Sequence, residues 1–157
     1  MIFFKKQSGF GLVETLVATG ILTIVIGATV SLTTMTLKNS STISNEIVAN
    51  HLIIEVFEAA RQIRNTNYID EKPGTDWDNG LANGTYGDIN IDSLTNKISL
   101  IPSEIIINLN NINFSRKCVI TDSGDVKTIK CDISWLENTR AKSKTASYIL
   151  TNYEQDF

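Results

Sequence analysis

Histidine is almost absent from this sequence, and the motifs that most often mark catalysis are missing from it. His51 is the only histidine among the 157 residues, and no cysteine lies near it. A zinc cluster or a cysteine–histidine nucleophile pair therefore cannot be assembled locally. No G-x-S-x-G sequence, P-loop or G-x-G-x-x-G sequence occurs either. We therefore expect that the protein is not an enzyme and binds no cofactor. The remaining catalytic alternative is a pair of carboxylates that lie far apart in the sequence. We place His51 on the surface of a helix.

Positive charge is scarce over most of the chain. Of the 14 bases, Lys5 and Lys6 precede the first apolar run, and of the 17 acids only Glu14 lies near its start. The remaining residues, 38–157, hold 14 − 2 = 12 bases and 17 − 1 = 16 acids, a net charge of −4. A nucleic-acid surface needs a surplus of bases, so we expect no direct nucleic-acid binding.

One long segment lacks charge altogether. The 23 residues of 15–37 carry none, and no proline occurs from Phe10 to Leu37. At ~1.5 Å per residue, such a helix spans a bilayer core of ~30 Å. Lys5 and Lys6 predict a cytoplasmic N-terminus with the rest of the chain outside. A cleaved secretory signal is disfavoured, because its apolar core is normally ~7–15 residues long and ends in a small-residue site that this run lacks.

An acid at the start of this apolar run needs an explanation. An ionised carboxylate costs at least ~2.5–3.5 kcal/mol at mid-bilayer, yet Glu14 stands within the sequence "KKQSGFGLVETLV". Basic residues, Gly9, Phe10, an acid four residues later and a long apolar run occur there together. This combination resembles the N-terminal signature of type IV pilins and of the pseudopilins of type II secretion systems.

The resemblance implies how the chain is processed and where it acts. A leader containing Lys5 and Lys6 would be cut between Gly9 and Phe10 by a prepilin peptidase, and Phe10 would be N-methylated. The implied protein is a structural subunit whose partners are other pilins or pseudopilins and the inner-membrane assembly platform. It would start as a single-pass precursor in the bacterial inner membrane and end in a pilus or pseudopilus. Many pilins carry a proline in the later part of the apolar helix, associated with local melting, and this chain lacks it. Gly20 and Gly27 are the residues left to weaken the helix there, by ~1 kcal/mol each relative to alanine.

The implied cut suggests a role for Glu14. It would leave a charged amino group on Phe10, four residues away and on the same helix face. In a bundle of helices, the carboxylate would meet the amine of a neighbouring chain, and because a lone buried charge is heavily penalised, such a pair selects one register. The plainer alternative is an interfacial residue near the membrane surface.

The pattern along the chain predicts an α+β fold, with a long N-terminal helix packed on an antiparallel sheet. We expect a leader at 1–9, a transmembrane or filament-core helix at 10–37, an amphipathic continuation at 38–64 and an outer β domain at 65–157. The buried stripe of the continuation would be Ile53, Val56, Phe57, Ala60 and Ile63. Within it, "KNSSTIS" at 38–44 is the weakest part of the helix, and a break there is the alternative. Residues 65–96 suggest loops, and strands are predicted at 97–102, 104–109, 116–121, 126–135 and 145–153.

One hairpin can be predicted with its register. A two-residue loop at Gly124–Asp125 pairs residues whose numbers sum to 249, which places Cys118 opposite Cys131. That is a non-hydrogen-bonded site with Cα atoms ~4.5 Å apart, within reach of a disulfide. Two unpaired buried thiols are the alternative. The same register predicts one apolar face, made of Phe114, Ile120, Ile129, Ile133 and Trp135.

Two weaker motifs and one alternative function remain to be considered. "DWDNG" at 76–80 resembles the start of a calcium loop, but Gly87 stands where an EF-hand needs glutamate, so we expect no metal there, with a different calcium site using Asp88 or Asp92 as a lesser alternative. Trp135 and the final "LTNY" at 150–153 are similar to the last strands of minor pilins and minor pseudopilins. The competing function is an anchored outer domain that binds a ligand and does not polymerise.

Overall fold

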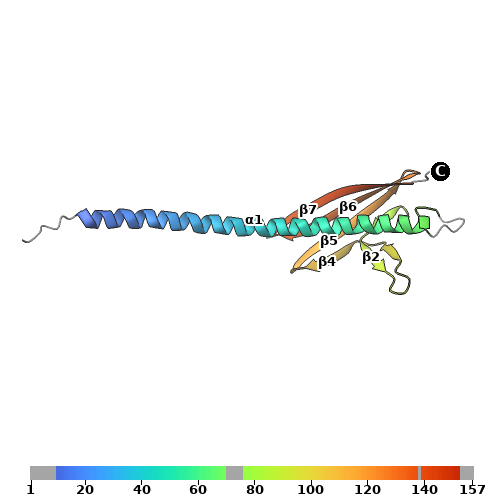
Figure 1. Ribbon diagram of the computed structural model, residues 1–157, viewed down its shortest axis with the longest axis horizontal. Coiled ribbons are helices and arrows are strands. Elements are labelled where there is room, and N and C mark those ends of the chain that lie inside the picture. The colour runs from blue at the N-terminus through green and yellow to red at the C-terminus, as the bar shows by residue number, and fades with distance from the viewer. Residues whose placement is uncertain (1–9, 70–75, 138, 153–157) are drawn as a thin grey trace, which may run out of the picture. The chain divides into compact units, whose positions relative to one another are not determined.

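The computed structural model describes residues 10–69, 76–137 and 139–152 (Figure 1). Helix α1 spans Phe10–Ile69, and all the strands follow it. They are β1 (Gly84–Tyr86), β2 (Asp88–Ile91), β3 (Ile98–Ile101), β4 (Ile105–Leu109), β5 (Ile112–Asp122), β6 (Val126–Glu137) and β7 (Arg140–Thr151). One long helix before antiparallel strands confirms the predicted α+β class. The chain divides into two compact units, with the boundary between Ile43 and Ser44.

The first unit contains the apolar part of α1. This is the one helix among the described residues that is long and apolar enough to cross a membrane, and none of its most apolar window is buried. Its threonine hydroxyls are satisfied within the helix: for example, Thr15 donates to the carbonyl of Leu12 at 3.0 Å, and Thr33 to that of Thr29 at 2.8 Å. Because these hydroxyls are already bonded, they do not oppose an apolar environment.

Helix α1 is continuous, as predicted, and it extends beyond its predicted end. It continues through 38–44, where the Thr42 hydroxyl donates to the Lys38 carbonyl at 3.1 Å instead of breaking the helix. It ends at Ile69 rather than near Arg64. The last turn is held by distant partners, since the Asn67 amide donates to the carbonyls of Trp77 at 3.0 Å and Asn79 at 2.8 Å. Sequence propensity could not include these tertiary contacts.

The second unit is built on a five-stranded antiparallel sheet. Its order is β1-β5-β6-β7, with β4 also paired to β5, and β2 and β3 form a separate two-stranded sheet. The prediction of loops at 65–96 was wrong for β1 and β2, which are short and lie close to turns. Strand β7 also begins at Arg140, earlier than predicted. Its first residues are polar and exposed, so they lack the apolar alternation that marks a strand.

The β5–β6 hairpin has the predicted register. Cys118 pairs with Cys131, Ile120 with Ile129, and the pairing continues in one direction to Phe114 and Trp135. Gly124 starts the two-residue loop with a φ of +81°, a conformation that glycine adopts without a steric cost. All five residues of the predicted apolar face are buried. The hairpin prediction is therefore confirmed in register and in orientation.

Helix α1 packs on the buried, apolar face of β5 and β6. The predicted stripe is buried at Ile53, Val56, Ala60 and Ile63, while Phe57 is half-buried. The Phe57 ring stacks on Tyr148 of β7, with ring centroids 5.3 Å apart. One core results, and most of its buried members come from the helix and from the three longest strands: Ala49, Leu52, Ile53, Val56, Ala59, Ala60 and Ile63 of α1, Phe114, Cys118 and Ile120 of β5, Ile129, Cys131, Ile133 and Trp135 of β6, and Leu150 of β7.

Candidate functional site

The predicted processing and assembly residues lie at the start of α1. Lys5, Lys6 and Gly9 fall outside the described residues, and Phe10 is the first residue of the helix. Glu14 lies one turn further along, exposed among exposed apolar side chains that include Val13 and Val17. A carboxylate near a helix N-terminus is favoured by the helix dipole. This segment thus offers one anion on an otherwise apolar helix, four residues from the proposed new N-terminus.

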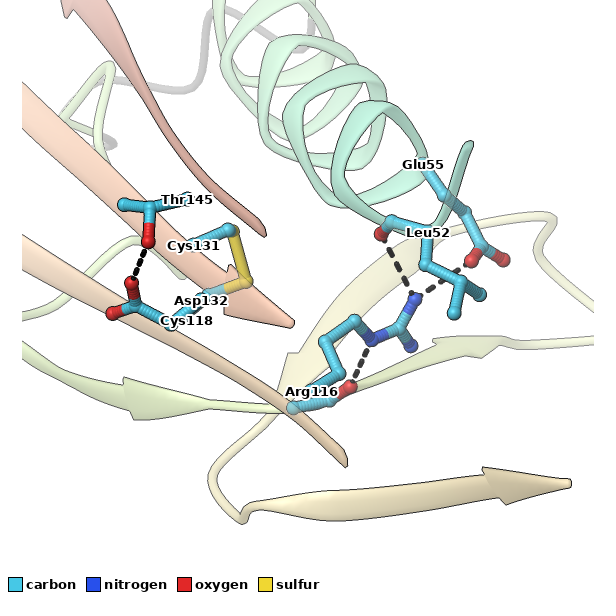
Figure 2. Close-up of a disulfide and its surroundings, with 8 residues drawn as sticks. Leu52, Glu55, Arg116, Cys118, Cys131, Asp132 and Thr145 are labelled. Carbon is cyan, nitrogen blue, oxygen red and sulfur yellow. Dashed lines mark hydrogen bonds and ion pairs between the residues drawn. A yellow bond between two sulfur atoms is a disulfide. The ribbon is translucent and has the colours of Figure 1, made fainter. Parts of the chain in front are cut away.

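Cys118 and Cys131 form a disulfide across neighbouring strands (Figure 2). Their Cα atoms are 4.0 Å apart, and neither side chain is exposed. The bridge lies on the face of β5 and β6 that packs in the core. On the opposite face of β6, the Thr145 hydroxyl of β7 donates to the Asp132 carboxylate at 2.5 Å, which joins β7 to the disulfide-linked strand.

We expect the bridge to carry a large part of the stability of the second unit. The two cysteines are 13 residues apart, and cross-linking a loop of that size contributes roughly 3 kcal/mol in chain-entropy estimates. A double Cys118→Ala and Cys131→Ala variant should melt well below the parent. In the parent, unfolding with a reductant should add about 2 Da to the intact mass, as two thiols form. An unchanged mass would show that the bridge is not present.

Arg116 is a charged residue inside the core, and it connects three elements (Figure 2). Its side chain is 2% exposed. The guanidinium donates to the Gly87 carbonyl at 2.5 Å, to the Leu52 carbonyl at 3.3 Å and to the Glu55 carboxylate at 2.7 Å. A carboxylate oxygen of Asp88 lies 3.7 Å away. Arg116 therefore ties β5 both to α1 and to the segment that joins β1 to β2.

Gly87 allows this approach because it has no side chain. A Cβ at this position would overlap the Ser103 carbonyl oxygen and lie 2.8 Å from the Ile105 amide nitrogen. Both atoms belong to the backbone, so neither can move aside easily. The glycine thus lets the β1–β2 connection pass close to the start of β4 and present its carbonyl to Arg116.

Lys127 is the second buried base. Its ammonium lies 2.6 Å from Asp78 and 2.5 Å from Asp122, and its side chain is 2% exposed. Burial alone would lower the pKa of Lys127, but hydrogen bonds to Asp122 and Asp78, with their charges, raise it above its usual 10.5. The hydrogen bond from Lys127 also lowers the pKa of Asp122 below its usual 3.8. Lys127 therefore joins the turn around Asp78 to the β5–β6 hairpin.

This triad predicts a pH window. The depressed pKa of Asp122 gives stability above its unfolded value of 3.8, which is lost as the pH falls through the folded pKa. The raised pKa of Lys127 gives stability below 10.5, which is lost as the pH rises through the folded pKa. A Lys127→Met variant should melt below the parent by about 5 °C near neutral pH. That difference should shrink at both extremes of pH, and a difference independent of pH would contradict the role of the triad.

The remaining candidates do not gather into a site. His51 is exposed on α1, as predicted. The turn at 76–80 uses its Asp76 and Asp78 carbonyls to accept hydrogen bonds from Asn79 and Leu81. Within the described ranges, no group of three or more histidine, cysteine or acidic side chains is arranged to hold a metal ion.

Comparison with known proteins finds a match at the N-terminal segment that holds Phe10 and Glu14. Residues 4–30 match the family described as the prokaryotic N-terminal methylation motif. The chain therefore carries the signature of type IV pilins and pseudopilins, and the predicted resemblance is confirmed. No curated protein and no solved structure matches the chain. The motif supports a membrane-anchored, pilin-like precursor, and it points to a structural subunit rather than an enzyme.

Sequence reasoning missed what Arg116 and Lys127 do. Both stand at inward positions of the predicted hairpin, in register with Ile133 and Asp122. A base on an otherwise apolar face was the available signal. The partners that make burial acceptable, such as Glu55 and Asp78, come from distant parts of the sequence.

Proposed function

We propose that this chain is a subunit of a type IV pilus or a type II secretion-like filament. Its precursor is cut after Gly9, N-methylated at Phe10 and assembled through the first part of α1. The match of residues 4–30 to the methylation motif carries this proposal. It is supported by an apolar helix segment that buries none of its most apolar window within its own chain and so needs a membrane or neighbouring helices around it.

Processing tests the proposal directly. The full chain would be produced in cells with and without an active prepilin peptidase, and its intact mass and N-terminus determined. We expect a peptidase-dependent product that begins at a methylated Phe10. A Gly9→Val variant should stay uncut, whereas Gly11→Ala, where the added Cβ meets nothing within 4 Å, should be cut normally.

Two results would contradict the proposal. One is a chain that still begins at Met1 while a control pilin in the same cells is cut. The other is cleavage beyond the apolar run. Either would favour an anchored ligand-binding domain instead.

We propose further that the subunit is a minor one, on the likeness of Trp135 and residues 150–153 to the last strands of minor pilins. A minor subunit should be far less abundant than the main pilin in purified filaments, which quantitative mass spectrometry measures. Equal abundance would assign the chain to the shaft.

A further inference from the structure

A row of three bases lies on the outermost strand of the sheet. Strand β7 pairs only with β6 among the described strands. Arg140, Lys142 and Lys144 alternate along it and therefore point to one face. All three are exposed, and no carboxylate in the described ranges forms an ion pair with them. The nearest acid in register, Glu137, instead accepts a hydrogen bond from Asn45 at 3.0 Å.

The opposite edge of the same domain is acidic. Glu55 and Asp88 flank the Arg116 guanidinium, with side chains 56% and 39% exposed. Glu104 is exposed just before β4, the strand on the far side of β5 from β6 and β7. Arg116, which pairs with Glu55 and Asp88, is itself withdrawn into the core, and Glu104 accepts a hydrogen bond from Ser115, so the three carboxylates face solvent. Figure 1 places β7 on one side of the second half of α1 and β2 and β4 on the other.

We propose that the basic row (Arg140, Lys142 and Lys144) of one chain docks on the acidic flank (Glu55, Asp88 and Glu104) of a second copy. The two surfaces lie on opposite edges, so one chain cannot satisfy its own row. A contact between different surfaces of identical chains repeats into an open series rather than closing as a two-fold dimer. The occupant is a second copy because the complementary charge is in this same chain.

This contact rests on the proposed function, because only assembly in a membrane or filament makes it strong enough to form. Exposed ion pairs are individually weak and are screened by salt. Membrane anchoring and filament packing would raise the effective concentration of one domain near the next. The charges then fix which edge meets which, since complementary charge contributes orientation more than affinity. A minor subunit needs only two adjacent copies to use it.

The plainer role of the row is edge protection. Lysines on an edge strand discourage pairing with strands of other molecules. That role needs no particular partner and predicts no preferred contact with the acidic flank. Docking therefore predicts that the carboxylates nearest to the basic row are those of the acidic flank, whereas edge protection predicts no particular carboxylates there.

Cross-linking between isotopically distinct copies tests the contact. Equal amounts of ¹⁴N- and ¹⁵N-labelled full chain would be reconstituted together in membranes and treated with a carbodiimide, which joins amines to carboxylates in direct contact. We expect mixed-isotope peptides that join Lys142 or Lys144 to Glu55, Asp88 or Glu104. Their yield should fall several-fold between low salt and about 0.5 M salt, where the screening length drops to roughly 4 Å.

Matched variants separate contact from general charge. K142E/K144E should abolish the mixed-isotope links. K117E/K130E changes the net charge equally, at exposed lysines of β5 and β6 on the other face of the sheet, and should retain them. Mixing K142E/K144E copies with E104K copies should restore a link, now between position 142 or 144 and position 104.

Three outcomes would overturn the proposal: links only within single copies, mixed links at other carboxylates, or equal loss with K117E/K130E. N-terminal processing is measured separately. A chain that is cut at Gly9 but gives no mixed links would remove this contact and leave the proposed function standing.

Discussion

Replacing Glu14 with glutamine should leave the chain in the membrane and remove most of it from filaments. The substitution makes α1 more apolar at its start, so insertion is not impaired. In the assembled state, it would leave the Phe10 amine of a neighbour without its partner. Breaking a buried pair costs about 3–5 kcal/mol, which corresponds to at least a roughly 100-fold loss of incorporation.

The measurement is the ratio of filament-associated to membrane-associated chain, determined by quantitative immunoblotting. Glu46→Gln is the matched control, because Glu46 is an exposed acid of the same helix within the second unit. It should incorporate normally. Unimpaired incorporation of Glu14→Gln would remove the register role and leave an interfacial residue.

Replacing Arg116 with alanine should produce the largest loss of stability in the second unit. The change opens space in the core and removes the donors to Gly87 and Leu52, while Glu55 loses its closest partner. Core truncation and loss of a buried ion pair each cost roughly 3–5 kcal/mol, and they overlap here. We expect the melting temperature to fall by more than about 10 °C.

Tryptophan fluorescence follows this transition, because Trp77 and Trp135 both lie in the second unit. Lys117→Ala, the exposed neighbour on β5, should change the melting temperature by no more than a degree or two. Arg116→Met separates volume from charge. If it melts like the parent, the guanidinium contributes no net stability, and the expected effect of alanine is due to lost packing alone.

Local patterns predicted the parts of the fold whose partners are close in sequence. The β5–β6 register follows from one turn, so the pairing of Cys118 with Cys131 could be worked out by counting. The stripe on α1 follows from helical periodicity. Strands β1 and β2 could not be found in this way, because they are only 3 and 4 residues long, and β1 also depends on a distant neighbour, β5. The candidate site divides similarly, since the N-terminal signature is contiguous whereas the environment of Arg116 is assembled from three separate segments.

The burial of the disulfide sets an order of events during maturation. Cys118 and Cys131 have no exposed surface and belong to the core that α1 covers. Thiol–disulfide exchange needs direct attack on a sulfur atom, so an oxidising enzyme must act before the helix closes over the hairpin. After closure, the same covering keeps small reductants away from the bond. The second unit should therefore acquire its cross-link once, early, and keep it for as long as the unit stays folded.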